Sequence, residues 1–103
     1  MFAHVVLFRP RPHLDPADVA RLVDEFTRRV GEIPSVRRTR VGRRALIGAA
    51  YEQLPQPDLS HVAILEFDDR AGLQAYLTAP AHDEIGRRFW EVSEEQLVYD
   101  FEL

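Results

Sequence analysis

The sequence has 103 residues and contains neither cysteine nor lysine. Without cysteine, the chain cannot form a disulfide, a thiolate nucleophile, or a cysteine-based zinc or iron–sulfur site. The absence of cysteine agrees with a cytoplasmic location, where disulfides are rare. Because lysine is absent, all 13 basic residues are arginine. We interpret this usage as a consequence of genome composition rather than of function.

Long hydrophobic runs and a positive net charge are also missing. No apolar run approaches the roughly 20 residues that a membrane-spanning helix needs. The apolar opening segment, residues 1–9, is too short and too early for a signal peptide. The net charge of −4 argues against general nucleic-acid binding, which depends on neutralising phosphates. We therefore expect a soluble protein with no targeting segment, no membrane and no nucleic acid as partners.

The length predicts a single domain over residues 1–103. The hydrophobic fraction of 46 % is ordinary for a globular protein. A domain of this size buries a thin core, because the buried share of the surface increases with chain length. Pairing of two identical subunits adds buried area, so the length agrees with a homodimer.

The first half of the chain predicts a strand, a helix and a weaker strand. Residues 2–9 alternate with apolar side chains on both faces, which is typical of a central strand. A helix begins at Asp15-Pro16, since aspartate is a favoured N-cap and proline suits the first helical position. It ends at Gly31. Residues 36–44 form the weaker strand, with Arg38 and Arg40 on one face.

The second half predicts two helices between two strands. Residues 61–68 form a second central strand, and the Asp69-Arg70 turn leads into a helix that Pro80 stops. A further short helix follows, with acidic residues in its first turn, where they suit the helix dipole. Residues 97–103 close the chain as an alternating strand.

The element order β-α-β-β-α-β predicts an α+β fold, a ferredoxin-like antiparallel sheet with helices on one face. We expect the first and third strands to be neighbours and to run parallel. The second face of the sheet still carries apolar side chains. It needs cover, most simply by another copy of the chain.

Residues 45–60 do not predict regular structure. The segment is apolar at its start and then contains Pro55 and Pro57. Long loops in compact domains are often functional. The segment is therefore an arm at a subunit interface, a lid over a pocket, or plain surface packing, and the sequence leaves these alternatives open.

Arginines are concentrated in and around the weaker strand. Charged side chains on an edge strand prevent pairing with other sheets, and we favour this interpretation for Arg38 and Arg40. Binding of an anionic ligand is the alternative, because guanidinium groups recognise carboxylates and phosphates.

Three histidines and a tyrosine predict a pocket. If the first and third strands are adjacent and parallel, His4 and His61 lie at one end of the sheet. Tyr76 precedes His82 by six residues, and the bend at Pro80 lets both side chains converge on one cavity. Histidine exchanges protons near neutral pH, and a tyrosine hydroxyl stabilises a developing enolate. The alternative is that each histidine is a hydrogen-bonded structural group.

We do not expect a metal site. Three histidines can bind zinc. However, the four histidines of this chain lack ligand spacing such as His-x-x-x-His, and no carboxylate partner is evident. The fourth, His13, lies in a proline-rich loop and is predicted to be on the surface.

The chain resembles the stress-responsive A/B barrel (Dabb) family over nearly its whole length. The segments that carry the resemblance are Met1–Arg9, Ile33–Val36, Ser60–Asp68, Ala75–His82 and Val98–Glu102. The Pro80-Ala81-His82 element is specific to the family when it occurs with the opening strand histidine and the closing Asp-Phe pair. The resemblance implies a ferredoxin-like protomer and a homodimer closed into a dimeric α+β barrel.

Within that family the chain is similar to the olivetolic acid cyclase-type polyketide cyclases through residues 80–82 and 88–91. Such enzymes close a linear polyketide by intramolecular aldol condensation without a metal or cofactor. The similarity implies that His82 and Tyr76 are catalytic. It also implies that His4, His61 and Trp90 bind the substrate, with His4 and His61 at the floor of the pocket.

Other functions fit the same resemblance. One is a non-catalytic homodimer that takes part in a stress response or binds a small hydrophobic ligand in the same pocket. Another is a cofactor-free monooxygenase or isomerase of the same barrel superfamily. The sequence does not choose the ligand.

Overall fold

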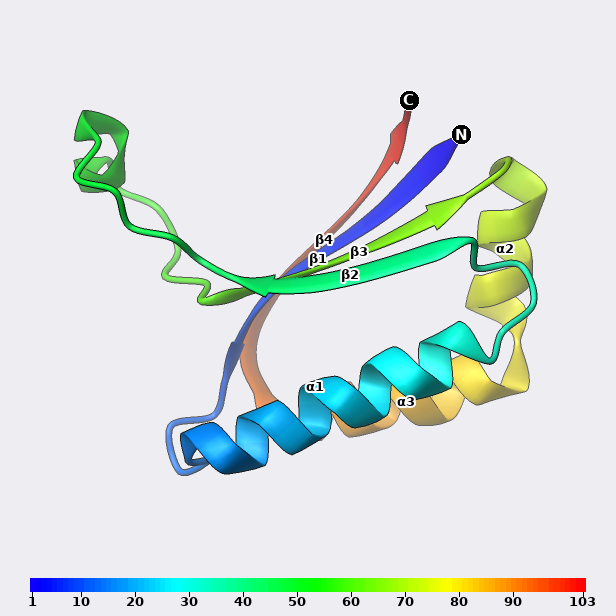
Figure 1. The fold of residues 1–103 in the computed structure, drawn as a ribbon, viewed down its shortest axis with the longest axis horizontal. Coiled ribbons are helices and arrows are strands. Elements are labelled where there is room, and N and C mark those ends of the chain that lie inside the picture. The colour runs from blue at the N-terminus through cyan, green and yellow to red at the C-terminus, as the bar shows by residue number, and fades with distance from the viewer.

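A computed structural model describes residues 1–103 as one sheet with helices packed on one of its faces (Figure 1). The elements in chain order are β1 (Phe2–Pro10), α1 (Pro16–Gly31), β2 (Arg38–Arg43), the 3-10 helix η1 (Ala50–Gln53), β3 (His61–Phe67), α2 (Arg70–Thr78), α3 (Pro80–Val92) and β4 (Ser93–Glu102). The molecule measures 38 × 31 × 17 Å. None of its helices combines the length and the apolar character needed to cross a bilayer.

The sheet has the strand order β2-β3-β1-β4, and every neighbouring pair is antiparallel. This confirms the α+β ferredoxin-like fold and the central positions of β1 and β3. The predicted direction of β3 was wrong, because β3 runs antiparallel to β1. The crossover through α1 makes β2 parallel to β1, and the return from β2 then reverses β3.

This correction separates two of the predicted site residues. In the β1–β3 register, His4 lies opposite Leu65, whereas His61 lies opposite Phe8. The two histidines are therefore four residues apart along the paired strands, which corresponds to about 13 Å. They do not share one end of the sheet.

The helices cover one face of the sheet, with α1 and α3 side by side beneath it (Figure 1). α1 begins where predicted, because Asp15 and Asp18 form a reciprocal capping box ahead of its first turn. An ion pair of 2.5 Å between Arg29 and Glu84 links α1 to α3. α3 starts at Pro80 itself, which occupies the first helical turn, where its missing N–H is harmless.

The hydrophobic core lies between the helices and the end of the sheet where β3 leads into α2. Its centre is Phe67, whose side chain is completely buried. The other members are apolar or aromatic and come from α1, β3, α2, α3 and the turn after α1: Val30, Ile33, Leu65, Leu73, Tyr76 and Ile85. Because Tyr76 belongs to this core, its ring is held in place by packing.

No α-helix covers the second face of the sheet, although the segment 45–60 borders it beside Leu7, Val62 and Leu97. We call it the open face. By the alternation of the strands, its apolar residues are Ala3, Val5, Leu7, Val62, Ile64, Leu97, Tyr99 and Phe101, and the Arg40–Glu66 ion pair lies on the same face. Tyr99 and Phe101 are 53 % and 49 % exposed. A contiguous apolar surface of this kind marks an interaction site.

The segment 45–60 projects away from the helices (Figure 1). Its tip is closed by Glu52, whose carboxylate accepts hydrogen bonds from the backbone N–H groups of Ile47 and Gly48. Gly48 has φ = +79°, a conformation that favours glycine at this turn. Leu46 and Tyr51 on this arm are exposed.

Candidate active site

An apolar cavity of about 290 Å³ lies between the helices and the sheet. This is the lower end of the range of roughly 300–1,000 Å³ that is usual for ligand pockets. Its wall is mostly hydrophobic and includes Val6 and Phe8 of β1, Val23 and Phe26 of α1, and Phe89 of α3. The cavity is thus on the helix-covered face, apart from the open face of the sheet.

Three titratable side chains reach this cavity, namely His4, Tyr76 and His82. The ring centroid of Tyr76 lies 4.8 Å from that of His82 and 5.6 Å from that of His4. The convergence of Tyr76 and His82 is confirmed, since the junction at Pro80 turns the end of α2 and the start of α3 toward one another. The Tyr76 ring therefore packs against both histidines.

Burial sets the protonation states of Tyr76 and His82. Desolvation raises the pKa of Tyr76 to about 12, so its hydroxyl keeps its proton at neutral pH. Desolvation lowers the pKa of His82 below the ordinary 6.5, and the charge of His4 lowers it further, while Asp83 acts in the opposite direction. At neutral pH the cavity therefore holds a neutral imidazole beside a protonated phenol.

Asp100 is a site residue that sequence reasoning missed. It lies opposite His4 in the β1–β4 register, and its Oδ1 atom is 2.6 Å from His4 Nδ1. His4 is buried, whereas the side chain of Asp100 is 44 % exposed. The alternation of the closing strand, combined with its pairing to β1, is the signal that could have found this carboxylate.

Trp90 lines the same cavity. Its side chain remains 63 % exposed, and Leu77 and Val98 are also exposed cavity residues. Residues that line a cavity and still face solvent mark its mouth. The mouth therefore opens beside α3 and β4, with Trp90 at its rim.

The structure does not bring His61 to this cavity. Its ring stacks on Phe8 at 5.3 Å, and its Nδ1 atom is 2.8 Å from Ser60 Oγ. Burial lowers the pKa of His61, and the charge of Arg43 lowers it further. His61 is therefore at the far side of Phe8, away from Tyr76 and His82.

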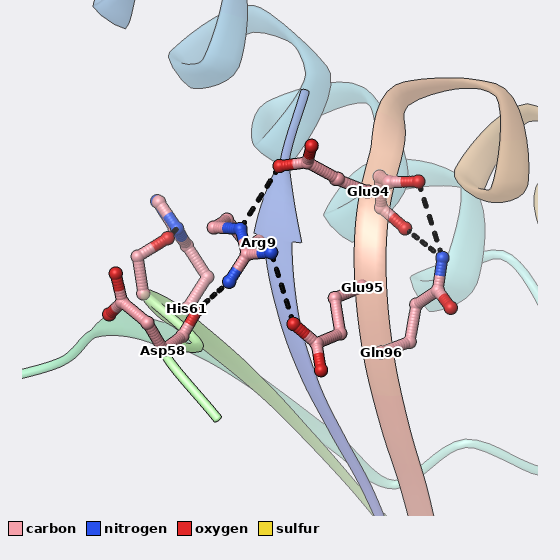
Figure 2. Close-up of polar contacts among 8 residues, drawn as sticks. Arg9, Asp58, His61, Glu94, Glu95 and Gln96 are labelled. Carbon is pink, nitrogen blue, oxygen red and sulfur yellow. Dashed lines mark hydrogen bonds and ion pairs between the residues drawn. The ribbon is translucent and has the colours of Figure 1, made fainter. Parts of the chain in front are cut away.

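The side chain of Arg9 links the end of β1 to the start of β4 (Figure 2). It contacts Glu94 at 3.1 Å and Glu95 at 3.0 Å, and it donates to the backbone carbonyl of Asp58 at 2.6 Å. The hydrogen bond to Glu94 raises the pKa of the Arg9 guanidinium. Each of the three guanidinium nitrogens of Arg9 therefore has an oxygen partner.

The side chains of this protein form no metal-binding cluster. No group of three or more histidine, aspartate or glutamate side chains is placed to hold an ion. What the cavity does offer is proton exchange. A neutral imidazole accepts a proton, a protonated phenol donates a hydrogen bond, and apolar walls strengthen both interactions.

Comparison with known proteins relates the sequence to a family and the fold to solved structures. Residues 2–103 match the family model described as "Stress responsive A/B Barrel Domain", Dabb. No curated protein matches the sequence. Solved structures do match it, at sequence identities that indicate a shared fold.

Three of these structures are informative. A dimeric ferredoxin-like protein of unknown function from Thermobifida fusca is 18 % identical, with a TM-score of 0.75 over 99 % of this chain and 90 % of its own. A hydroxynitrile lyase from Passiflora edulis is 14 % identical, with a TM-score of 0.81 over 97 % of this chain and 90 % of its own. A variant of SnoaB, a cofactor-independent oxygenase from Streptomyces nogalater, is 18 % identical, with a TM-score of 0.73 over 99 % and 91 %.

Proposed function

This chain belongs to the stress-responsive A/B barrel (Dabb) family, and from that premise we propose that it is a cofactor-free acid–base enzyme of the aldol-type polyketide cyclase class. The substrate class is a small, mostly apolar molecule that carries carbonyl groups. His82 and Tyr76 are the catalytic residues. His4 and Trp90 bind and orient the substrate.

The observation that carries this proposal is the His82–Tyr76 pair in an apolar cavity. The two rings are 4.8 Å apart, and burial shifts their pKa values in opposite directions, so one group is a neutral base and the other a protonated donor. Groups whose environments separate their pKa values in this way are typical of acid–base sites. A structural role alone does not require both groups to face a cavity.

The proposed reaction begins when His82 takes a proton from a carbon that lies next to a carbonyl group. The electron pair of the broken C–H bond moves onto the carbonyl oxygen, and the Tyr76 hydroxyl donates a hydrogen bond to the resulting enolate. The enolate carbon then attacks a second carbonyl group of the same molecule, and a carbon–carbon bond forms as the first carbonyl is restored. The new alkoxide receives its proton from His82.

His4 and Asp100 support this pair as positioning residues. The carboxylate of Asp100 accepts from His4 Nδ1, which selects the tautomer and orientation of the imidazole ring. The His4 ring in turn packs against Tyr76 at 5.6 Å. Asp100 therefore acts on the site through His4.

Purified protein supplied with a linear tetraketide thioester tests the proposal. We expect a ring-closed product, detected by mass spectrometry and formed faster than in buffer alone. The His13→Ala variant should form it at the same rate, because His13 is exposed in the loop before α1. Tight binding of the thioester with no ring closure would contradict the enzyme proposal.

That last outcome would favour a binding protein that holds a hydrophobic ligand without chemistry. The specific observation behind this second candidate is the apolar wall and the open mouth at Trp90. Fold alone does not choose between reactions, because relatives with this fold are named as a lyase and as an oxygenase. Our choice of acid–base chemistry rests on His82 and Tyr76.

We further propose that two copies of the chain pair through the open face. Its apolar side chains face solvent in a single copy, and an isologous pair buries both surfaces against each other. A structurally similar protein from Thermobifida fusca is dimeric. The cavity lies on the other side of the sheet, so each subunit of the pair keeps its own cavity and mouth.

Tyr99→Arg should convert this dimer to a monomer. The substitution places a charge among the apolar side chains of the pairing surface, where desolvation costs several kcal/mol. Because Tyr99 is 53 % exposed in one copy, the fold itself should tolerate the change. Sedimentation equilibrium gives the mass.

Ala17→Arg is the matched control for this measurement. It adds the same charge at an exposed position of α1, on the helix side of the sheet, and should leave the mass unchanged. A wild-type chain that sediments as a monomer, or a Tyr99→Arg chain that remains dimeric, would refute pairing through the open face.

A further inference from the structure

The acid–base cavity adjoins a second, polar hollow. This hollow lies between the start of α1 and the ends of β1 and β2, where β3 begins, and its volume is about 570 Å³. Val23 of α1 and Val41 of β2 line both spaces. Val23 and Val41 therefore form a boundary that the two spaces share.

The charges around the hollow leave one guanidinium, that of Arg43, without any ion-pair or hydrogen-bond partner. Arg9 is paired with Glu94 and Glu95. Arg11 donates to the backbone carbonyls of Trp90 and Glu91.

Arg43, at the end of β2, has neither an ion pair nor a side-chain hydrogen bond, and it lines the hollow. The hollow holds one carboxylate of its own, that of Asp24 on α1. Arg43 is therefore the cation of this hollow that is available to a ligand.

Two neutral hydrogen-bonding groups lie beside Arg43. His61 is its direct neighbour in the β2–β3 register and carries a hydrogen bond to the Ser60 hydroxyl. The His61 ring also stacks on Phe8, which lines the acid–base cavity. His61 thus stands where the polar hollow meets the apolar wall.

We propose that Arg43, Ser60 and His61 bind the carboxylate end of an elongated acyl substrate, whose apolar chain passes Val23 and Val41 into the cavity. This assigns a ligand-binding role to His61, at a different place from the cavity floor. The spacing suits such a molecule, because His4 and His61 are separated by about 13 Å along the strands. The carboxylate end would be held at one side while the reacting carbons lie between Tyr76 and His82.

A carboxylate fits this hollow better than a phosphate. The planar fork of the Arg43 guanidinium matches the two oxygens of a carboxylate. A phosphate monoester carries close to two negative charges at neutral pH. The carboxylate of Asp24 would oppose the second charge.

The inference rests on the enzyme proposed above and on the same cavity, and it adds to the substrate class a terminal carboxylate that is remote from the thioester. Binding measurements test it without any reaction. Isothermal titration calorimetry should show octanoate binding the wild-type protein more tightly than octanamide, its neutral isostere.

Arg43→Gln should weaken octanoate about tenfold, the effect of one charge-assisted hydrogen bond, and leave octanamide unchanged. The control is Arg87→Gln, on an exposed position of α3 outside both spaces, which should bind both ligands as the wild type does.

The outcomes separate the two proposals. If octanoate and octanamide bind equally to the wild type, or if Arg43→Gln weakens both by the same factor, the carboxylate site is refuted while the cavity stands. A preference for octyl phosphate over octanoate would refute the carboxylate assignment. If octanoate binds the wild type more tightly than octanamide does, but tetraketide ring closure fails, the carboxylate site is upheld and the enzyme proposal is refuted.

Discussion

Replacing His82 by alanine is expected to lower kcat/KM for tetraketide ring closure by about 100- to 10,000-fold, the usual contribution of a positioned general base. His82 is the neutral imidazole of the cavity, and its ring lies 4.8 Å from Tyr76. The third cavity group, His4, is bonded to Asp100 through Nδ1, and we assign it a positioning role. Steady-state kinetics with the thioester measure the loss.

The pH dependence provides a second measurement of the same role. Because burial and His4 lower the pKa of His82, the base form persists below pH 6.5. kcat/KM should therefore stay level from neutral pH downward and fall only as the pH passes through that lowered pKa. Tyr76, with a pKa of about 12, adds no loss on the alkaline side within the usual assay range.

Asp83 allows the assignment to be checked without touching the cavity. Its charge raises the pKa of His82, so Asp83→Asn should move the acid limb of the profile to lower pH. If the midpoint of the acid limb lies at or above pH 6.5, or does not move in Asp83→Asn, the titration belongs to a group other than His82. Equal kcat/KM in His82→Ala and wild type would remove His82 from the mechanism.

Phe67→Ala is expected to cause the largest loss of stability, about 3–5 kcal/mol in the free energy of unfolding. Phe67 is completely buried at the end of β3, and its ring lies 5.5 Å from that of Tyr76. Removing the ring leaves a void at the centre of the core, which the surrounding elements fill only in part. A domain of this size is stable by about 5–15 kcal/mol, so the variant loses a large share of the total.

Urea unfolding monitored by circular dichroism measures this loss. Phe67→Leu is the matched variant, because it keeps most of the apolar volume and should lose much less. Tyr76 packs against Phe67. The rate of tetraketide ring closure per folded molecule of Phe67→Ala should therefore also be lower than that of the wild type. A loss below about 1 kcal/mol would show that the core can collapse around the missing ring.

Much of the fold could be predicted from the sequence because the signals are local. Alternation of side chains identified β1 and β3 as central strands, and Asp15-Pro16 marked the start of α1. β4 begins at Ser93, four residues before its predicted start. The charged residues there, Glu94 and Glu95, hide the alternation, and their pairing with Arg9 of β1 is a contact that the local pattern does not contain.

The candidate site divides in the same way. The sequence by itself determined that Tyr76 and His82 converge, because both belong to one short segment whose path bends at Pro80. Only the tertiary structure decided the partners of the other residues. Asp100 meets His4 across 96 residues of chain, and His61 lies beside Arg43 and Phe8 instead of beside His4. Strand direction and register determine such pairs, and they depend on how the whole sheet closes.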